Sequence, residues 1–117
     1  FLRQQRILIV EDHAAVRAGL LAEFAANLPD AQVRVAADEA RARKEFDLFN
    51  PTLCLVDLIL GGARSLADGI GLIEDLARSA SGTAILVYSA VEDADLARRA
   101  LAAGARGFIA KSEPMEN

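Results

Sequence analysis

The chain alternates short apolar runs with longer segments in which apolar residues recur at helical spacing. Short runs bounded by turn residues predict buried strands, and the periodic segments between them predict amphipathic helices. Strict alternation of the two predicts an α/β fold, a parallel sheet with helices on both faces. The expected strands cover residues 6–10, 32–36, 52–56, 84–88 and 106–110, and the expected helices cover 13–27, 39–49, a segment between Asp68 and Ser81, and 92–103.

Three of the expected helices carry an apolar stripe that should face the sheet. Asp68 is the expected N-cap of the third helix, and Ser81-Gly82 closes it. Gly104 lies where a C-terminal glycine cap belongs after the fourth helix. The three stripes are Val16, Leu20, Leu21 and Phe24; Ile70, Ile73, Leu76 and Ala77; and Leu96, Ala97, Ala100 and Leu101.

Polar residues directly follow four of the expected strands. Glu11-Asp12, Asp57, Ser89 and Lys111 each stand where an apolar run ends. The carboxyl ends of parallel strands meet at one edge of an open sheet, and ligands bind at that edge. We therefore expect three carboxylates, one hydroxyl and one ammonium to share a cleft.

Length and composition indicate one soluble domain. The chain has 117 residues, and no apolar stretch approaches the about 20 residues that span a membrane. The N-terminus, Phe1 to Arg6, has no secretory signal pattern, so we expect a cytoplasmic protein with no membrane association. The single cysteine, Cys54, cannot form an internal disulfide and is expected to pack within its strand.

The charge balance of the chain is acidic, with a net charge of −4 and a pI of about 4.9. Binding to a nucleic-acid backbone requires clustered Lys and Arg side chains. This segment is therefore not expected to bind nucleic acid, and any contact with DNA must come from another part of the protein.

The last expected strand is not followed by a complete helix. Five strands alternate with only four helices, and the chain stops at Asn117, just after Pro114, which suits the first turn of another helix. A parallel edge strand needs cover on both faces, so one face near the last strand should be bare or be covered by something outside this sequence. Since the initiator Met is also absent, we expect one domain over residues 1–117, truncated within or before its fifth helix.

The acidic residues at the strand ends require an explanation. Carboxylates about 4 Å apart repel by roughly 4 kcal/mol at an effective dielectric of about 20. Either protons are held there, or a hard dication such as Mg²⁺ lies among the oxygens, in a site suited to phosphoryl transfer. The alternative is that Glu11 and Asp12 are solvated loop residues. His13 could be interpreted as a metal ligand, but Mg²⁺ prefers oxygen, so His13 is expected to be a polar first-turn residue.

These residues resemble the receiver domains of bacterial two-component response regulators. The resemblance covers nearly the whole chain and implies a flavodoxin-like (CheY-like), doubly wound sheet of five parallel strands, with the last helix largely absent. The first and last matching stretches are most similar to receivers of LuxR/NarL/FixJ-type regulators, which carry a C-terminal helix-turn-helix DNA-binding domain. The stretches are Val10-Glu11-Asp12-His13, Val56-Asp57-Leu58, Ser89-Ala90, and Gly104-Ala105-Arg106-Gly107-Phe108-Ile109-Ala110-Lys111-Ser112.

The resemblance implies a phosphoacceptor site. Asp57 would accept a phosphoryl group from the phosphohistidine of a sensor histidine kinase. Asp12, Asp57 and the backbone carbonyl of Ile59 would bind Mg²⁺, and Glu11 would act mainly through a bound water. Lys111 would pair with Asp57 at rest and then hold an oxygen of the transferred group.

The resemblance also implies a switch and not an enzyme. Ser89 would move to hydrogen-bond the phosphoryl group, and Phe108 would turn inward behind it. The altered surface around the fourth helix and fifth strand would control an output, expected to be transcription, through DNA contacts of a missing C-terminal domain. That same region can also support a homodimer. On sequence alone, Phe108 could be a plain core residue.

Two stretches depart from the family pattern. The loop from Leu58 to Gly69 is several residues longer than usual, and Arg64 within it either approaches the phosphoryl group or is simply solvated. Ile59 and Val91 are apolar at positions that flank the path of the attacking water. Neither can orient a water by hydrogen bonding, so we expect slow self-dephosphorylation.

Other functional classes fit less well. A phosphatase of the haloacid dehalogenase type needs a second acid two residues after Asp57, where this chain has Ile59. Dinucleotide-binding folds and P-loops need glycine patterns that are absent after the first strand. The remaining alternative is a phosphorylation-independent, receiver-like protein-interaction module.

Overall fold

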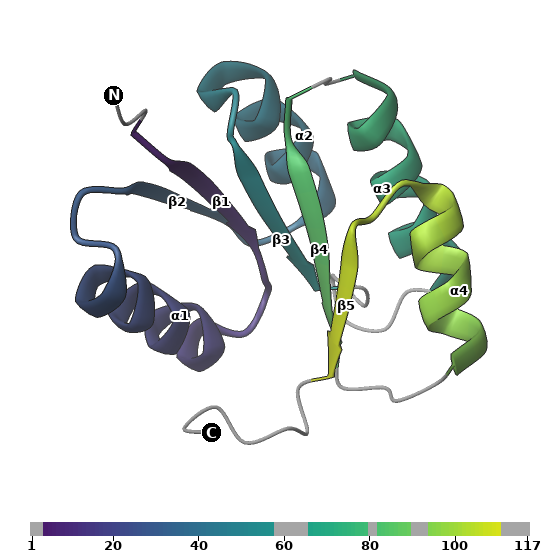
Figure 1. Cartoon of the computed structure of the whole chain (residues 1–117), viewed down its shortest axis with the longest axis horizontal. Helices are drawn as coiled ribbons and strands as arrows, with labels where there is room; N and C mark the ends of the chain where they lie inside the picture. The colour runs from purple at the N-terminus through teal and green to yellow at the C-terminus, as the bar shows by residue number, and fades with distance from the viewer. Residues whose placement is uncertain (1–3, 58–65, 80–81, 90–93, 111–117) are drawn as a thin grey trace.

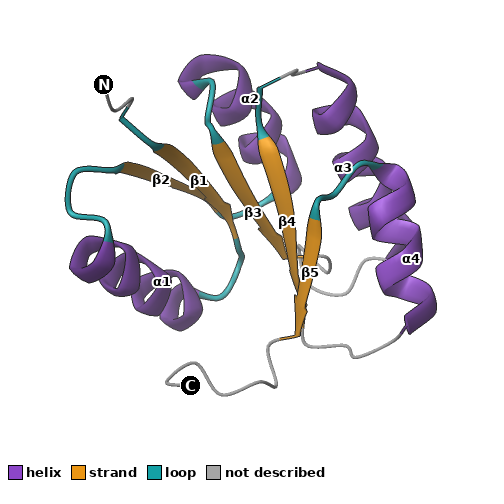
Figure 2. Ribbon diagram, in the orientation of Figure 1, coloured by secondary structure: helices purple, strands orange, loops and turns teal. Residues whose placement is uncertain are grey.

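The structure is a computed structural model that describes residues 4–57, 66–79, 82–89 and 94–110. Nine elements alternate in this part of the chain (Figures 1 and 2). They are β1 (Arg6–Val10), α1 (Ala14–Asn27), β2 (Gln32–Ala36), α2 (Glu39–Phe49), β3 (Leu53–Asp57), α3 (Leu66–Ser79), β4 (Ala84–Ser89), α4 (Ala94–Ala103) and β5 (Gly107–Ala110).

All four strand pairs are parallel, and the strand order is β2-β1-β3-β4-β5. This is the doubly wound, flavodoxin-like order, so the predicted fold class is confirmed. The strands were predicted to within one residue at each end. Figure 1 shows β3, β4 and β5 running the same way and ending at one edge of the sheet.

One predicted helix start was wrong. α3 begins at Leu66, so Asp68 lies inside the first helical turn and is not the N-cap. The sequence signal is ambiguous because an acidic residue is favoured both at the N-cap and in the first turn, where it faces the positive end of the helix dipole. α3 also ends at Ser79, before the predicted stop at Ser81, which lies outside the described residues.

Helices α2, α3 and α4 cover one face of the sheet, and α1 lies on the other (Figure 1). Alternate residues of each strand point to opposite faces. In β1, Leu8 and Val10 therefore join the core beneath α2–α4, while Ile7 and Ile9 join the core beneath α1. All four side chains are buried, which explains the continuous apolar run in the sequence.

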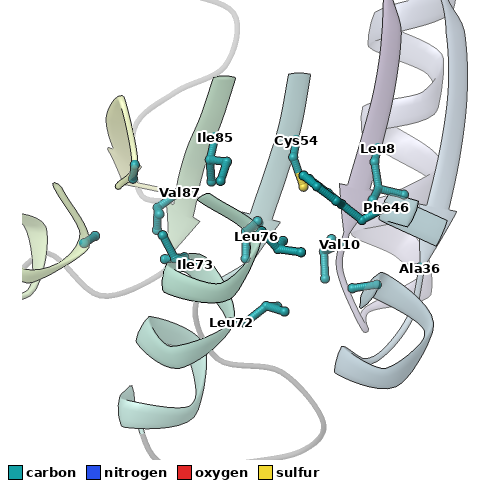
Figure 3. Close-up of a cluster of buried hydrophobic side chains, with 14 of the residues drawn as sticks. Leu8, Val10, Ala36, Phe46, Cys54, Leu72, Ile73, Leu76, Ile85 and Val87 are labelled. Atoms are coloured by element: carbon teal, nitrogen blue, oxygen red, sulfur yellow. The ribbon is translucent and has the colours of Figure 1, made fainter. Parts of the chain in front are cut away.

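The larger core lies between the sheet and α2–α4 (Figure 3). Leu72, Ile73 and Leu76 of α3 point toward the strands, so the predicted stripe of this helix is confirmed, with Leu72 as an additional member. Cys54 is fully buried in this core. Burial raises the pKa of its thiol to about 12, so Cys54 is an inert packing residue, as predicted.

The α1 face is less completely covered. Leu20 is the buried residue of α1, while Leu21 is 37% exposed, so the predicted stripe of this helix was only partly right. On β5, Ile109 is 38% exposed. Among the described residues, α1 is the only helix on this face. The residues after Ala110 lie outside the described part of the chain, so the expectation of a bare face near the last strand stays a prediction.

Surface ion pairs join α2 to α3. Arg43 contacts Asp75 at 2.6 Å and Glu39 at 2.7 Å, and Arg78 contacts Asp75 at 2.7 Å. Hydrogen bonds from Arg43 and Arg78 hold the pKa of Asp75 below its ordinary value. The contribution of these pairs to stability is therefore present at neutral pH and is lost as the pH falls through the lowered pKa of Asp75.

Two glycines provide a matched test of the packing between α3 and α4. Gly104 has a φ of +124°, and a Cβ added there would lie 2.5 Å from Cβ of Ala77. Gly19 lies within α1, and an added Cβ would meet nothing within 4 Å. We expect Gly104→Ala to lower the free energy of unfolding by about 1–3 kcal/mol, and Gly19→Ala to raise it by about 0.5–1 kcal/mol. Urea unfolding followed by circular dichroism measures both, and equal effects of the two variants would contradict this packing.

Candidate functional site

The candidate site lies at the carboxyl ends of β1 and β3. These neighbouring strands lie at the point where the winding of the sheet reverses, the usual ligand-binding position in doubly wound folds. Val10 pairs with Val56, so Glu11 and Asp57 follow at the same level on adjacent strands. The backbone N–H of Glu11 also donates to the carbonyl of Ala36 at 3.0 Å, which joins this level to the end of β2.

The structure brings the three predicted carboxylates together. One ligand atom each from Glu11, Asp12, His13 and Asp57 lies within 4.8 Å of the other three. Glu11 is 1% exposed and Asp57 is 5% exposed, the only buried charged residues in the described chain. Solvated loop residues would be exposed, so the alternative explanation for Glu11 does not hold.

His13 contacts both acids that precede it. Its backbone N–H donates to Oε2 of Glu11 at 3.1 Å, and its ring Nδ1 lies 3.1 Å from the same oxygen. Nδ1 also lies 3.3 Å from Oδ1 of Asp12, at ion-pair distance. The rest of the ring is in solvent, since the side chain is 70% exposed.

Arg17 connects α1 to the acidic loop. Its Nη1 donates to the backbone carbonyl of Glu11 at 2.9 Å, and its own backbone N–H donates to the carbonyl of His13 at 2.9 Å. Both hydrogen bonds connect the loop between β1 and α1 to the first turns of α1. The loop that carries Glu11 and Asp12 is thus held from both ends.

The donor set fits a hard divalent cation. Oδ1 of Asp12 is buried and accepts no hydrogen bond from any described residue. Within the described chain its one polar contact is the ion pair with Nδ1 of His13 at 3.3 Å, and a bound cation would offset the cost of burying this oxygen. The three clustered carboxylates supply the oxygen ligands that Mg²⁺ prefers.

The remaining predicted site residues are only partly described. Ser89 is the last residue of β4 and pairs with Ala110 of β5; only its backbone is described. Phe108 pairs with Val87 and is half-buried against the larger core. Ile59, Arg64, Val91 and Lys111 lie outside the described residues.

The strand register extends the site across the sheet. Asp57 pairs with Tyr88, so Ser89 follows one step further along β4. Ser89 pairs with Ala110 of β5, and Ala110 directly precedes Lys111 in the sequence. The register thus places the backbone of Ser89 near the end of β3 that carries Asp57. Lys111 lies outside the described residues, so its place at this edge stays a prediction.

Comparison with known proteins assigns this arrangement to a family. Residues 7–117 match the response regulator receiver domain. The chain belongs to this family. The resemblance seen in the sequence is therefore confirmed. Receiver domains bind Mg²⁺ at an acidic site, in agreement with the acidic cluster seen here. Receiver domains also interact with histidine kinases.

Individual relatives agree with this assignment of the receiver domain. The methanol utilization control regulatory protein MoxX of Paracoccus denitrificans is 35% identical over 112 residues, which cover 96% of this chain and 49% of MoxX. A LuxR family two-component response regulator from Aurantimonas sp. SI85-9A1 superimposes with a TM-score of 0.78 at 27% identity, covering 95% of this chain and 76% of that one. The predicted likeness to LuxR-type receivers is thus confirmed.

A third relative was solved in a modified state. The structure of a response regulator protein from Burkholderia pseudomallei contains a phosphorylated aspartic acid, a calcium ion and citrate. It matches with a TM-score of 0.79 and 27% identity, covering 97% of this chain and 63% of that one. This receiver domain spans about half the length of the curated relatives that it matches.

Two contacts of the receiver domain were not predicted from its sequence. His13 was expected to be a helix-start residue, and Arg17 was given no role. The sequence spacing contained both signals, because His13 adjoins the acidic pair and Arg17 lies one helical turn after His13.

None of the described helices has the length and apolar character needed to cross a membrane.

Repulsion among the clustered acids of the receiver domain should lower its stability when no cation is bound. We expect Asp12→Asn to raise the free energy of unfolding by about 1–2 kcal/mol in the presence of a chelator, because it removes one charge from the cluster. Addition of Mg²⁺ should then stabilise the wild type more than the variant. Urea unfolding with and without Mg²⁺ measures both effects.

Asp75→Asn is the control for this comparison. Asp75 is paired with two arginines, so its replacement should not stabilise the protein and should leave the effect of Mg²⁺ unchanged. A metal-free Asp12→Asn variant that is less stable than the wild type would show that repulsion among the acids is not significant.

Proposed function

We propose that this chain is the phosphoacceptor receiver domain of a two-component response regulator and that Asp57 accepts the phosphoryl group. The proposal rests chiefly on one observation: Asp57 is buried at the end of β3, at the reversal point of the sheet, within 4.8 Å of the other acidic ligand atoms. A buried carboxylate among like charges suits a reactive group better than a surface residue.

The proposed reaction moves one phosphoryl group between two proteins. A carboxylate oxygen of Asp57 attacks the phosphorus of a phosphohistidine on the partner kinase, so an O–P bond forms as the N–P bond breaks. The electron pair of the broken bond returns to the imidazole nitrogen of the kinase. The product is an aspartyl phosphate on Asp57, and no separate substrate is turned over, which is why we regard the domain as a switch and not as an enzyme.

The acidic cluster would serve this transfer by holding Mg²⁺. Asp12 and Asp57 would be direct ligands together with the backbone carbonyl of Ile59, and Glu11 would contribute mainly through water. The cation would neutralise charge that builds up on the phosphoryl oxygens. The hydrogen bonds from Arg17 and from the backbone of His13 support the proposal because they hold the loop that carries Asp12 and Glu11 in place.

The switch would pass from the site to β5. Ser89 would hydrogen-bond the phosphoryl group, Lys111 would hold one of its oxygens, and Phe108 would turn further inward. In the structure Phe108 is half-buried next to the core beneath α4, so its ring has an apolar surface available for such a movement. The new charge on Asp57 would thus be converted into a changed surface around α4 and β5.

The proposed output is transcription in the cytoplasm. The support is the likeness to a LuxR family response regulator and the fact that the chain spans about half of its curated relatives. We propose that the receiver itself does not contact DNA, that a DNA-binding domain elsewhere in the protein does so, and that a homodimer forms through the α4 and β5 region. The acidic net charge of this segment agrees with that division.

Phosphorylation of Asp57 can be tested with a small phosphodonor in the presence of Mg²⁺. Mass spectrometry should show one phosphoryl group on the wild type and none on Asp57→Asn, while Asp75→Asn should be modified like the wild type. Beryllofluoride with Mg²⁺, which mimics the aspartyl phosphate, should shift the amide signals of Ser89 and Phe108. No modification and no shift in the wild type would favour the phosphorylation-independent interaction module.

The lifetime of the phosphorylated state provides a second test. Ile59 and Val91 have no hydrogen-bonding side chain, so the wild type should lose its phosphoryl group slowly. We expect Ile59→Asn to accelerate the loss by about 10-fold, because the amide can orient the attacking water. Decay is followed after removal of the phosphodonor. An unchanged rate in Ile59→Asn would contradict this role of position 59.

A further inference from the structure

We propose that the side chain of Tyr88 separates Asp57 from an open groove beside α1 and thereby slows the hydrolysis of the aspartyl phosphate. The inference rests on the proposed function, because it concerns the lifetime of the phosphoryl group on Asp57. In the sequence Tyr88 is only the last residue of a predicted strand, so this role depends on the tertiary structure.

Tyr88 is the neighbour of Asp57 on the side of β3 that faces away from the acids. Asp57 pairs with Tyr88 across β3 and β4, while Glu11 follows β1 on the other side of β3. Side chains alternate between the two faces of a sheet, so residues two apart on a strand share a face. Leu55 and Leu86, the pair two residues earlier, both pack in the core beneath α1. Asp57 and Tyr88 therefore lie side by side on the α1 face.

The side chain of Tyr88 packs between β4 and α1. It is 9% exposed and belongs to the core beneath α1, together with Leu20 and Ile9. With Leu20 and Val16, it also lines a groove of about 280 Å³ between α1 and β4. A tyrosine buries about 150–250 Å² when it packs, so this one side chain occupies much of the space at that end of β4.

The groove beside α1 is open to water. Gly19 and Glu23 also line it, and both are exposed. Its volume is enough for several water molecules, since each takes up about 30 Å³ in the liquid. Asp57 is 5% exposed and is not among the described residues that line the groove. Because Tyr88 lines the groove and is also paired with Asp57, its side chain is placed between the two.

The step that this arrangement would slow is hydrolysis of the aspartyl phosphate. The oxygen of a water molecule attacks the phosphorus and forms a new O–P bond as the O–P bond to Asp57 breaks. The electron pair of the broken bond regenerates the carboxylate of Asp57, and the proton lost by the water passes to the released phosphate or to solvent. Excluding water protects a reactive intermediate from this step, and an apolar ring beside Asp57 excludes water from that side.

The decay of the phosphorylated state in Tyr88 variants tests this role. We expect Tyr88→Ala to lose the phosphoryl group about 5–10-fold faster than the wild type, because truncation extends the groove to Asp57. Tyr88→Phe keeps the ring, so its rate should stay within about 2-fold of the wild type. Each variant is loaded with a small phosphodonor and Mg²⁺, and decay is followed by mass spectrometry after the donor is removed.

Leu20→Ala is the matched control. Leu20 lines the same groove from the α1 side and is buried in the same core, but it lies on α1 and not beside Asp57. Its truncation enlarges the groove and loosens the core while leaving Tyr88 in place. We therefore expect Leu20→Ala to lose the phosphoryl group at the wild-type rate.

A spectroscopic measurement checks the position of the ring independently of the decay rate. Tyr88 is the only tyrosine, and the chain has no tryptophan, so intrinsic fluorescence above the weak emission of phenylalanine comes from this side chain alone. Beryllofluoride with Mg²⁺ should change the emission of the wild type and leave that of Asp57→Asn unchanged. Acrylamide should quench the emission weakly in both states, because the ring stays buried.

The outcomes separate this role from the proposed function. Urea unfolding checks that each variant is folded, and Tyr88→Leu, expected to decay about 3-fold faster than the wild type, replaces Tyr88→Ala if the latter is not. A wild-type rate in the folded truncation variant, equal acceleration by Leu20→Ala or Tyr88→Phe, or an emission that does not respond to beryllofluoride would overturn the role of Tyr88. A wild type that cannot be phosphorylated would instead overturn the proposed function.

Discussion

The site depends on the burial of carboxylates at the ends of two adjacent central strands. Glu11 and Asp57 are almost fully removed from water, although each is an acid beside another acid. Such burial is costly unless hydrogen bonds or a cation offset it. The surrounding contacts, from the backbone of His13 to the guanidinium of Arg17, act on the loop that carries these charges.

The sheet provides the rigid part of this arrangement. β1 and β3 are buried on both faces, so their ends cannot shift without disturbing two cores. The acids at the strand ends are therefore held close together by packing that lies beneath them. A group that gains charge at this point affects its neighbours directly, and the pairing of β4 with β5 leads from Ser89 to the half-buried Phe108.

Much of the fold and part of the site could be predicted from local patterns. Strands such as Leu53–Asp57 were recognisable because burial on both faces requires a continuous apolar run. The carboxylates could be placed together because parallel strands end at a common edge. The start of α3 was wrong because Asp68 is favoured at two helical positions, and α1 packs less of its stripe than its periodicity indicated, as the exposure of Leu21 shows.

The sequence by itself determined the order of elements, the parallel sheet and the gathering of acids at its edge, because each follows from periodicity or from the alternation of strands and helices. Only the tertiary structure decided that Glu11 and Asp57 are buried, that Arg17 reaches back to the Glu11 carbonyl, and that the His13 ring faces the acids. These features depend on side-chain directions after a turn, and the direction of the chain after β1 is set by how α1 packs against the sheet.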